Sequence, residues 1–265
     1  MNLESYRKQW LRYHRRYERT SYFILRMAFI KTVQSIDLSD ATQENYERLI
    51  KQGVISSNAI ERAYIDLYNT IGLLHGKRVL KDIQRQEKSL FTDNFQREVA
   101  KFLTNFGGQR IRTVGNSLAD WLISEIAKGQ QEGVSISQIV TNILKKRSFY
   151  RWQLLRIART ESTAAANYAS DAASSSTGIV LQKVWVSAQD PRTRVVPEDA
   201  FDHLHMNGKR VDDGQPFQVP TKRGGIELMR FPGDPNGSAG DVINCRCAMV
   251  KVPKRDSNGN IVRKF

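Results

Sequence analysis

Asp241-Val242-Ile243-Asn244-Cys245-Arg246-Cys247 is the stretch around which this chain is organised, because it holds both cysteines of the 265 residues. Earlier in the same C-terminal segment, His203 and His205 supply two of the four histidines. In a strand, residues i and i+2 point to the same face, so both thiols could converge on one point, and both imidazoles could do the same. Two histidines and two thiolates would satisfy tetrahedral Zn²⁺. Small buried thiols and surface imidazoles without a metal are the alternative.

The composition describes an ordered chain with a strong positive charge. Hydrophobic residues make up 40% and charged residues 26%, and the formal net charge is +14, most of it carried before residue 178. Such a field attracts polyanions, either nucleic acid or an acidic protein surface, unless it serves only solubility. No apolar run approaches the roughly 18 residues that span a bilayer, and the N-terminus lacks a signal-peptide pattern. We therefore expect folding in a cytoplasm, and two cysteines in a chain this long fit a reducing compartment.

Residues 4–34 predict a long helix with an aromatic seam between basic faces. Such a seam suits a partner groove or a phosphate backbone, and packing on its own domain with snorkelling arginines is the alternative. The candidate nucleic-acid or partner-binding residues are Arg7, Lys8, Trp10, Arg12, Tyr13, Arg15, Arg16 and Arg19.

Helical periodicity continues almost to residue 176. The pattern predicts these further helices: 41–52 closed by Gly53; 58 to about 86; 92–106 broken by Gly107-Gly108; a helix from Gln109 that Gly129 and Gly133 end; a short helix capped by Ser135 or Ser137 and running to Arg147; and 150–174.

All seven prolines lie beyond this point, where short strands are expected at 179–186, 217–219, 226–231 and 243–252, with a last strand after the Asn258-Gly259 turn. The predicted fold class is α+β: a mostly helical N-terminal region followed by a small β-rich C-terminal domain. We divide the chain into a basic helical region (1–148), whose charge suits a polyanion or an acidic protein partner, and a C-terminal domain (149–265) with a long helix and a small β-sheet.

The common catalytic signatures are missing from the sequence. There is no Gly-x-Gly-x-x-Gly fingerprint, no phosphate-binding Gly-Lys-Ser/Thr loop, no Gly-x-Ser-x-Gly elbow and no His-Glu-x-x-His. Their absence favours a protein that is not an enzyme and has no catalytic residues. A metal-dependent nuclease or an ADP-ribosyltransferase-like enzyme remains the alternative, with Glu161, Asp190, His203 and Glu227 as its candidate groups. A basic host protein that binds nucleic acid is a second alternative.

A specific order of motifs remains: Ala158-Arg159-Thr160-Glu161, Trp185, Asp190-Pro191-Arg192-Thr193-Arg194, His203 with Asn207-Gly208, Phe231-Pro232-Gly233-Asp234-Pro235 and Asn244-Cys245-Arg246-Cys247. This order resembles the Mu F-like minor head proteins of tailed phages, also called head morphogenesis proteins, over residues 149–252. Arg159 and Glu161, two apart on a helix, do not face each other, so each should reach a different partner. We expect a structural ion network of Arg159, Glu161, Asp190 and Arg192 that fixes the helix to the sheet.

The resemblance implies a protein of the virion, inside the capsid, that is present in the host cytoplasm during assembly. It implies the portal protein and double-stranded DNA, bound without sequence specificity, as partners, with the major capsid or scaffold protein as a further contact and no membrane. The expected role is to assist head assembly and the packaging or ejection of DNA. The resemblance also implies a metal-stabilised fold in which His203 matches the family's interval to Asn207-Gly208. His205 departs from that pattern, although the Zn²⁺ ligands expected here are His203, His205, Cys245 and Cys247.

Overall fold

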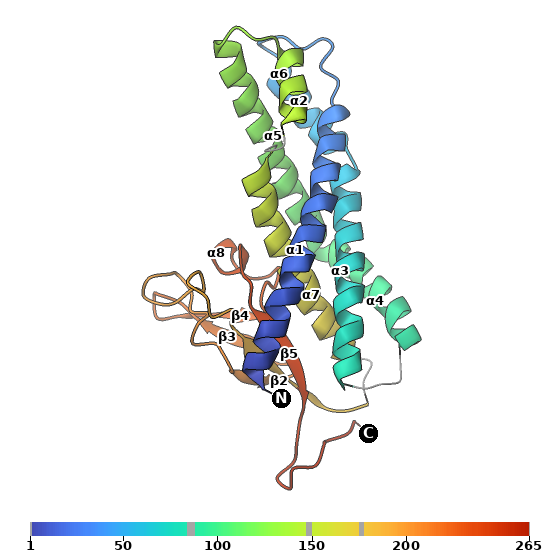
Figure 1. Ribbon diagram of the computed structural model, residues 1–265, viewed down its shortest axis with the longest axis vertical. Coiled ribbons are helices and arrows are strands. Elements are labelled where there is room, and N and C mark those ends of the chain that lie inside the picture. Colours follow the sequence, from blue (N-terminus) through green and yellow to red (C-terminus); the bar gives the residue numbers. More distant parts are fainter. Residues whose placement is uncertain (1, 84–87, 147–149, 175–177, 265) are drawn as a thin grey trace. The chain divides into compact units, whose positions relative to one another are not determined.

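The computed structural model describes residues 2–83, 88–146, 150–174 and 178–264. Helices fill most of the chain up to residue 174 and short antiparallel strands follow, so the predicted α+β class is confirmed (Figure 1). The chain forms two compact units. Unit 1 comprises Met1–Ser21, Leu67–Ala100 and Arg156–Phe265, and unit 2 comprises Tyr22–Asp66 and Lys101–Leu155. The division of the chain between 148 and 149 remains a prediction.

The helices largely follow the apolar periodicity of the sequence. They are α1 (Leu3–Gln34), α2 (Tyr46–Ser56), α3 (Ala59–Ile83), α4 (Lys88–Phe102), α5 (Gly108–Gln131), α6 (Ile136–Lys145), α7 (Arg151–Ser174) and the short α8 (Ala239–Val242). Ser135 is the N-cap of α6, and its hydroxyl accepts a hydrogen bond from the Gln138 amide. The predicted ends at Gln86 and Arg147 lie outside the described residues. None of the described helices combines the length and the apolar character needed to cross a bilayer.

Two predicted helix boundaries that involve glycine were wrong, and the helix predicted to begin at residue 92 begins at Lys88. The helix expected at 41–52 instead begins at Tyr46 and continues past Gly53. The Asn45 side chain holds the preceding turn, because it accepts from the Thr42 amide at 2.7 Å and donates to the Asp40 carbonyl at 3.0 Å. Gly53 allows α2 to pack closely against Ile36, since a Cβ at position 53 would lie 2.9 Å from the Ile36 side chain.

The second wrong boundary is Gly107-Gly108, which does not break the helical backbone. A π-helical turn, η1 (Leu103–Gly107), connects α4 to α5, and both glycines keep right-handed helical dihedral angles. Glycine lowers helix propensity without forbidding a helix, so packing can override it.

The strands belong to unit 1. They are β1 (Leu181–Val186), β2 (Arg210–Asp212), β3 (Phe217–Pro220), β4 (Ile226–Met229) and β5 (Ala248–Pro253). One antiparallel sheet has the order β2-β1-β5, with Trp185 opposite Met249, and β3 pairs with β4 in a separate hairpin. The predicted strand at 243–252 begins only at Ala248, so both cysteines lie in irregular backbone just before β5. β2 was not predicted, because it has three residues and no fully buried one.

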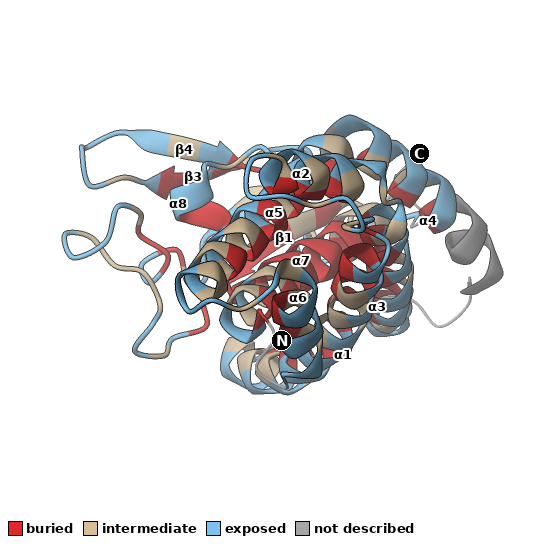
Figure 2. Cartoon of the chain, turned by 90° about the horizontal axis from the view of Figure 1, so that it is seen from above, coloured by how far each residue is buried: buried red, intermediate tan, exposed pale blue. Residues whose placement is uncertain are grey.

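The interior of unit 1 is centred on α7. Every residue from Thr160 to Ser170 is buried, and Figure 2 shows buried residues concentrated on α7 and β1. A helix that is buried on all sides has no polar face, so its polar side chains need partners inside the protein. Ser162 shows how they find them, since its hydroxyl lies 2.8 Å from the Ser21 hydroxyl of α1.

Unit 2 is held together by apolar packing between helices. In α2, Val54 packs against Gly115 of α5, where a Cβ would lie 3.4 Å from it. Tyr150 stacks at an angle against Phe29 and Trp121, with ring centroids 5.6 and 5.0 Å away. The core of unit 2 therefore follows directly from the spacing of its apolar residues.

Candidate functional site

Three potential metal ligands meet inside unit 1. His203, Cys245 and Cys247 each offer a ligand atom, and these atoms all lie within 4.8 Å of one another. The Nδ1 atom of His203 is 3.7 Å from each sulfur. The three residues are only 1–2% exposed. The structure thus contains a buried His/Cys/Cys cluster of the ligand types that soft or borderline metals prefer.

Asp241 orients the histidine of this cluster. Its Oδ1 atom lies 2.5 Å from His203 Nε2, which leaves Nδ1 to face the two sulfurs. Carboxylates in this position fix the tautomer and the ring orientation of metal-binding histidines. Burial lowers the pKa of His203. The charge of Cys245 and the hydrogen bond with Asp241 outweigh burial and raise this pKa to about 9. Asp241 is therefore a site residue that the prediction missed, although it opens the Asp241–Cys247 stretch.

The two thiols are inequivalent. Their mutual hydrogen bond raises the pKa of Cys245 and lowers the pKa of Cys247, with burial opposing ionisation of both. Thiolate is the form in which a cysteine binds a metal. Both cysteines are free of disulfide bonds.

The structure does not place His205 with the other expected ligands. Its side chain is 70% exposed, and its Nδ1 atom lies 2.7 Å from the Asp202 carboxylate. The i, i+2 rule did not apply, because residues 203–205 form a turn-rich loop rather than a strand. The buried cluster therefore offers three ligands from the predicted set of four.

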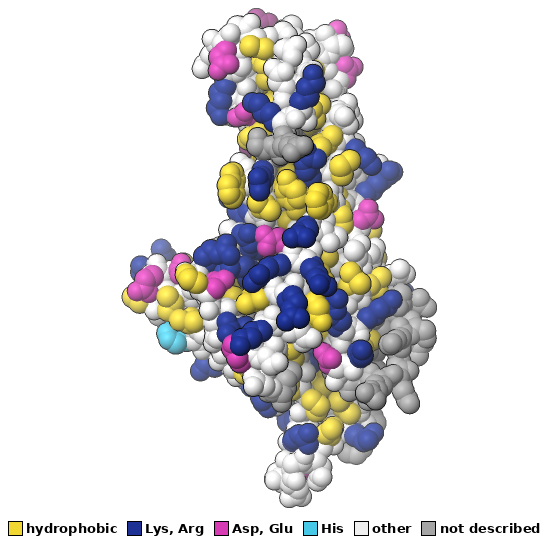
Figure 3. Space-filling view, in the orientation of Figure 1, with side chains coloured by type: hydrophobic (Ala, Val, Ile, Leu, Met, Phe, Trp, Pro, Cys, Tyr) yellow, Lys and Arg dark blue, Asp and Glu magenta, His cyan; other side chains and the backbone are white. Residues whose placement is uncertain are grey.

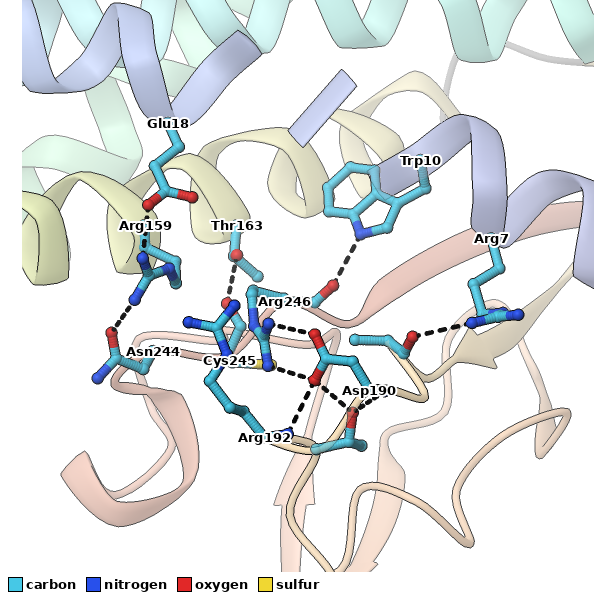
Figure 4. Close-up of polar contacts among 12 residues, drawn as sticks. Arg7, Trp10, Glu18, Arg159, Thr163, Asp190, Arg192, Asn244, Cys245 and Arg246 are labelled. Atoms are coloured by element: carbon cyan, nitrogen blue, oxygen red, sulfur yellow. Dashed lines mark hydrogen bonds and ion pairs between the residues drawn. The ribbon is translucent and has the colours of Figure 1, made fainter. Parts of the chain in front are cut away.

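Side chains of α1 and α7 hold the main chain of the Cys-Arg-Cys segment (Figure 4). Thr163 donates to the Cys245 carbonyl at 2.6 Å, and the Trp10 indole donates to the Arg246 carbonyl at 2.7 Å. Asn167 donates to the Cys247 carbonyl at 3.0 Å and accepts from the Met249 amide at 2.8 Å. The buried backbone groups of this irregular segment are thus paired without a sheet partner.

The Pro232-Gly233 turn completes the contact with α7. Asn167 also donates to the Pro232 carbonyl at 2.9 Å. Gly233 has φ +81°, and a Cβ there would lie 3.2 Å from Thr163 and 3.3 Å from the Ala164 backbone. A side chain at this position would meet both backbone strain and a steric clash, so glycine is required.

The residues of the expected ion network pair mainly with other groups. Arg159 donates to Glu18 at 2.6 Å and to Asn244 at 3.0 Å. Asp190 forms a two-pronged ion pair with Arg246, with one contact at 2.6 Å, and it accepts from the Arg192 amide at 3.1 Å.

Glu161 accepts from the Tyr68 hydroxyl at 2.8 Å. The structure therefore brings Asp190 and Arg192 together but links Arg159 and Glu161 to residues outside the expected set. Glu18 and Arg246 were missed, although Glu18 is the only acidic residue between Glu4 and Asp37 and so stood out in a basic helix.

The predicted binding residues on α1 divide into inward and outward groups. Trp10 is 1% exposed, and Tyr13 is half-buried beneath Arg78, whose guanidinium lies 3.9 Å from the ring centroid. Arg7 bonds to Glu4 and to the Ala188 carbonyl. The exposed members are Lys8, Arg12, Arg15, Arg16 and Arg19. The aromatic residues Trp10 and Tyr13 therefore pack within unit 1, which was the alternative interpretation of this helix.

The candidate groups of the enzyme alternative lie in separate contacts. Glu161 and Asp190 bind Tyr68 and Arg246, and Glu227 accepts from the Ser238 amide at 2.5 Å. His203 belongs to the buried cluster. The groups are tied into the fold individually, and their described contacts do not join them into one site.

The fold and site define an α+β protein whose C-terminal segment closes over a buried His/Cys/Cys cluster. Residues 122–250 match the family described as Phage Mu protein F like protein, which confirms the resemblance to Mu F-like proteins that the motif order predicted. The match begins within α5, earlier than the expected 149. No solved structure gives a significant match.

Two curated relatives each match 54% of the chain. Minor head protein GP7 of Bacillus phage SPP1 is 27% identical over 146 residues, which is 54% of this chain and 42% of GP7. NAD(+)–arginine ADP-ribosyltransferase EFV of Enterococcus faecalis is 26% identical over 147 residues, which is 54% of this chain and 28% of that protein. The chain thus spans less than half the length of each of these relatives.

Proposed function

We propose that this protein is a phage minor head protein that acts in head morphogenesis as a structural component of the virion. The observation that carries this proposal is the docking of α1 and α7 on the Cys-Arg-Cys segment of the family region. In this arrangement the titratable and metal-ligating side chains form contacts inside unit 1 that stabilise the fold. The family match and the similarity to a minor head protein agree with such a role.

The proposal favours a structural role over an enzymatic one because of where the reactive groups lie. His203, Cys245 and Cys247 are buried, and the carboxylates of Asp190 and Glu18 are bound by arginines. A catalytic acid or base must reach a substrate proton directly or through one water. The transferase activity in the name of one relative belongs to a protein of which this chain matches 28%.

We infer that double-stranded DNA binds the basic stripe, defined as Lys8, Arg12, Arg15, Arg16 and Arg19 of α1. These residues recur at helical spacing on one exposed face, and Figure 3 shows Lys and Arg side chains gathered over the region where α1 is drawn in Figure 1. Of the carboxylates nearest in sequence, Glu18 pairs with Arg159 outside the stripe, whereas Glu4 pairs with Arg7 and also with Lys8 at the end of the stripe. Contacts of this kind bind phosphates without reading sequence.

The remaining assignments complete the same proposal. The protein would sit inside the capsid at the portal and would assist the packaging or ejection of DNA. Contact with the major capsid or scaffold protein would occur during assembly in the host cytoplasm. The basic stripe would face DNA, and the region 122–250 that matches the family would contact the protein partners.

We infer that His203, Cys245 and Cys247 hold Zn²⁺. The donor set fits, since one imidazole and two thiols suit Zn²⁺, and Asp241 supplies the outer carboxylate that such histidines use. When bound, the ion would cross-link the loop that contains His203 to the Cys-Arg-Cys segment. A fourth ligand would complete the usual coordination.

Purified virions test the main proposal. We expect mass spectrometry to find the chain in particles released from a host that carries its gene, and affinity purification of the portal to recover it. Deleting the gene should give fewer or defective heads by electron microscopy, and the wild-type chain should rescue them. A chain missing from the particles, together with normal heads after deletion, would refute the proposal.

DNA binding is tested by replacing Arg12, Arg15, Arg16 and Arg19 with Gln. Each lost phosphate contact removes close to one unit from the slope of log K against log salt, so the slope should fall by about 3 to 4. The matched control replaces four exposed basic residues of the C-terminal segment, Lys209, Lys222, Arg223 and Arg263, with Gln. Equal effects of both sets would show that net charge alone acts.

The enzyme alternative is tested by incubating the protein with labelled NAD⁺ and an arginine-containing acceptor. We expect no transfer above the level of a heat-treated sample. Transfer that Glu161→Gln or Asp190→Asn abolishes would overturn the structural role.

Zinc is tested by elemental mass spectrometry on protein purified without chelator. The wild-type chain and His205→Ala should hold equimolar zinc, whereas Cys245→Ser and His203→Ala should lose it. Wild-type protein that is purified without zinc, and whose thermal stability does not change when a chelator is added, would rule the ion out.

A further inference from the structure

We propose that Arg159, Arg192 and Arg246, here called the arginine site, bind a phosphate group in unit 1. The chemistry is that of a tetrahedral oxyanion, which either a nucleic-acid backbone or a free phosphate could supply. The inference deepens the proposed contact with DNA and rests on it only for the source of the phosphate.

The arginine site carries one more guanidinium group than carboxylates, and the surplus belongs to the exposed Arg192. Three guanidinium groups face two carboxylates, those of Glu18 and Asp190. The side chains of Arg159 and Arg246 are only 19% and 8% exposed. The surplus positive charge therefore lies at the exposed edge of the site, where it can attract an anion from solution.

A hydrogen-bond donor in the site is also unused. Arg159 directs its two terminal nitrogens to Glu18 and Asn244, while its Nε–H is buried and has no acceptor among the described residues. Buried donors without an acceptor are rare in folded proteins. A phosphate oxygen is the kind of acceptor that a guanidinium fork is shaped to meet.

Arg192 supplies a guanidinium that can close over a ligand. Its backbone amide is fixed by Asp190, whereas the residue itself is exposed, and Figure 4 shows its side chain directed toward Arg246. Burial raises the pKa of the Asp190 carboxyl. The contacts with Arg246 and then with Arg192 outweigh burial and lower this pKa below its usual value. Asp190 therefore stays ionised and holds both arginines in position.

The backbone of the site is already held in place. Asn244 adopts φ 63°, a left-handed conformation that asparagine tolerates, and its amide donates to the Thr160 hydroxyl at 3.0 Å. The Arg246 carbonyl is bound by Trp10. Because these groups are ordered before a ligand arrives, binding would cost little conformational entropy.

A neighbouring histidine reports the same positive field. Burial, followed by the charges of Arg159 and Arg246, lowers the pKa of His14 to about 3.

The surroundings favour a polymer as the source of the phosphate. Arg15 lies three residues before Glu18 on α1, and Arg156 lies three residues before Arg159 on α7, so each shares a helix face with a member of the Glu18–Arg159 pair. Both are exposed. Arg15 also belongs to the basic stripe, which makes the arginine site continuous with the proposed DNA surface.

The test measures two probes on the full-length chain: inorganic phosphate by calorimetry and a short labelled DNA duplex by fluorescence anisotropy. Arg192→Gln removes an exposed guanidinium and should weaken phosphate binding roughly tenfold, the scale of one charge-assisted hydrogen bond. Arg159→Gln should weaken it further. Arg223→Gln, an exposed arginine in the β3–β4 turn, is the matched control and should change neither probe.

The outcomes separate the site from the source of its ligand. Loss of both probes in Arg192→Gln, with phosphate competing against DNA, supports a nucleic-acid phosphate. Loss of phosphate binding alone supports the site and assigns it to a free anion. Unchanged binding of both probes in Arg192→Gln and Arg159→Gln overturns the inference and shows that these arginines only brace the fold. In that case the DNA slope of the basic stripe still tests the proposed function separately.

Discussion

Units 1 and 2 differ in what they bury. Among the described residues, every buried polar or charged side chain except Thr32 belongs to unit 1. Unit 2 buries apolar residues such as Leu118, Leu122 and Ile126 between its helices. An apolar core tolerates changes that keep volume, whereas a polar core specifies one arrangement and is costly to leave half satisfied. The contrast teaches that unit 1 is built for a unique local geometry and unit 2 for bulk packing.

The largest expected effect breaks the polar core of unit 1. Asn167→Leu removes the partners of the Pro232 and Cys247 carbonyls and of the Met249 amide, so we expect a loss of roughly 4 kcal/mol or more in unfolding free energy. Urea denaturation gives the value, and labelling of Cys245 and Cys247 reports opening of unit 1. Ser170→Ala, a buried change on the same helix, is the control. Equal losses for both variants would contradict the role of Asn167.

The next effect probes the apolar core of unit 2. Leu118→Ala should cost about 3 kcal/mol through lost burial and a residual cavity. Leu118→Met keeps the volume and should cost less than about 1.5 kcal/mol. The thiols of unit 1 should stay protected at urea concentrations that open unit 2. A similar cost for both variants would mean that volume does not govern this core.

A third prediction concerns acid and is specific to unit 1. Burial and then the charge of Arg78 lower the pKa of His75 from 6.5 to about 3. Between those values the unfolded chain binds more protons than the folded one, so stability is full above pH 6.5 and falls as the pH drops. In this window the wild type should lose roughly 1.4 kcal/mol of unfolding free energy per pH unit through His75, and His75→Phe should not show this loss. Urea titrations from pH 7 to pH 4 test this, and parallel curves for the two proteins would refute it.

The smallest effect lies at a helix end of unit 2. Ser135→Ala removes the N-cap of α6 and should cost about 1 kcal/mol. Ser135→Asp should restore most of it, because aspartate also caps and favours a helix N-terminus. Thermal unfolding suffices as the measurement, with the exposed Ser137→Ala as its control. A cost from Ser137→Ala alone would move the cap to that residue.

Sequence periodicity found what local chemistry encodes. It located α1 and α7, narrowed the cap of α6 to Ser135 or Ser137, and found most of the strands, because side-chain spacing reports which face of an element is buried. It failed where a distant contact decides, as for Gly53 against Ile36 and for the three-residue strand β2.

The candidate site followed the same division. Scarcity of cysteine and histidine singled out His203, Cys245 and Cys247, but spacing could not show that His205 turns toward Asp202. The partners on α1 and α7, such as Trp10 and Asn167, come from far along the chain, and one sequence carries no signal for such pairings. The family resemblance supplied the order of the motifs but not the partners Glu18 and Arg246.

The hydrogen bond from Trp10 to the Arg246 carbonyl joins residues 236 positions apart. During synthesis the first turns of α1 therefore emerge long before the segment that receives them. Contacts of such long range slow folding, because much of the chain must be confined before they form. Unit 1 consequently cannot complete its core until residue 246 has been synthesised, and until then the Trp10 indole lacks its native hydrogen-bond acceptor.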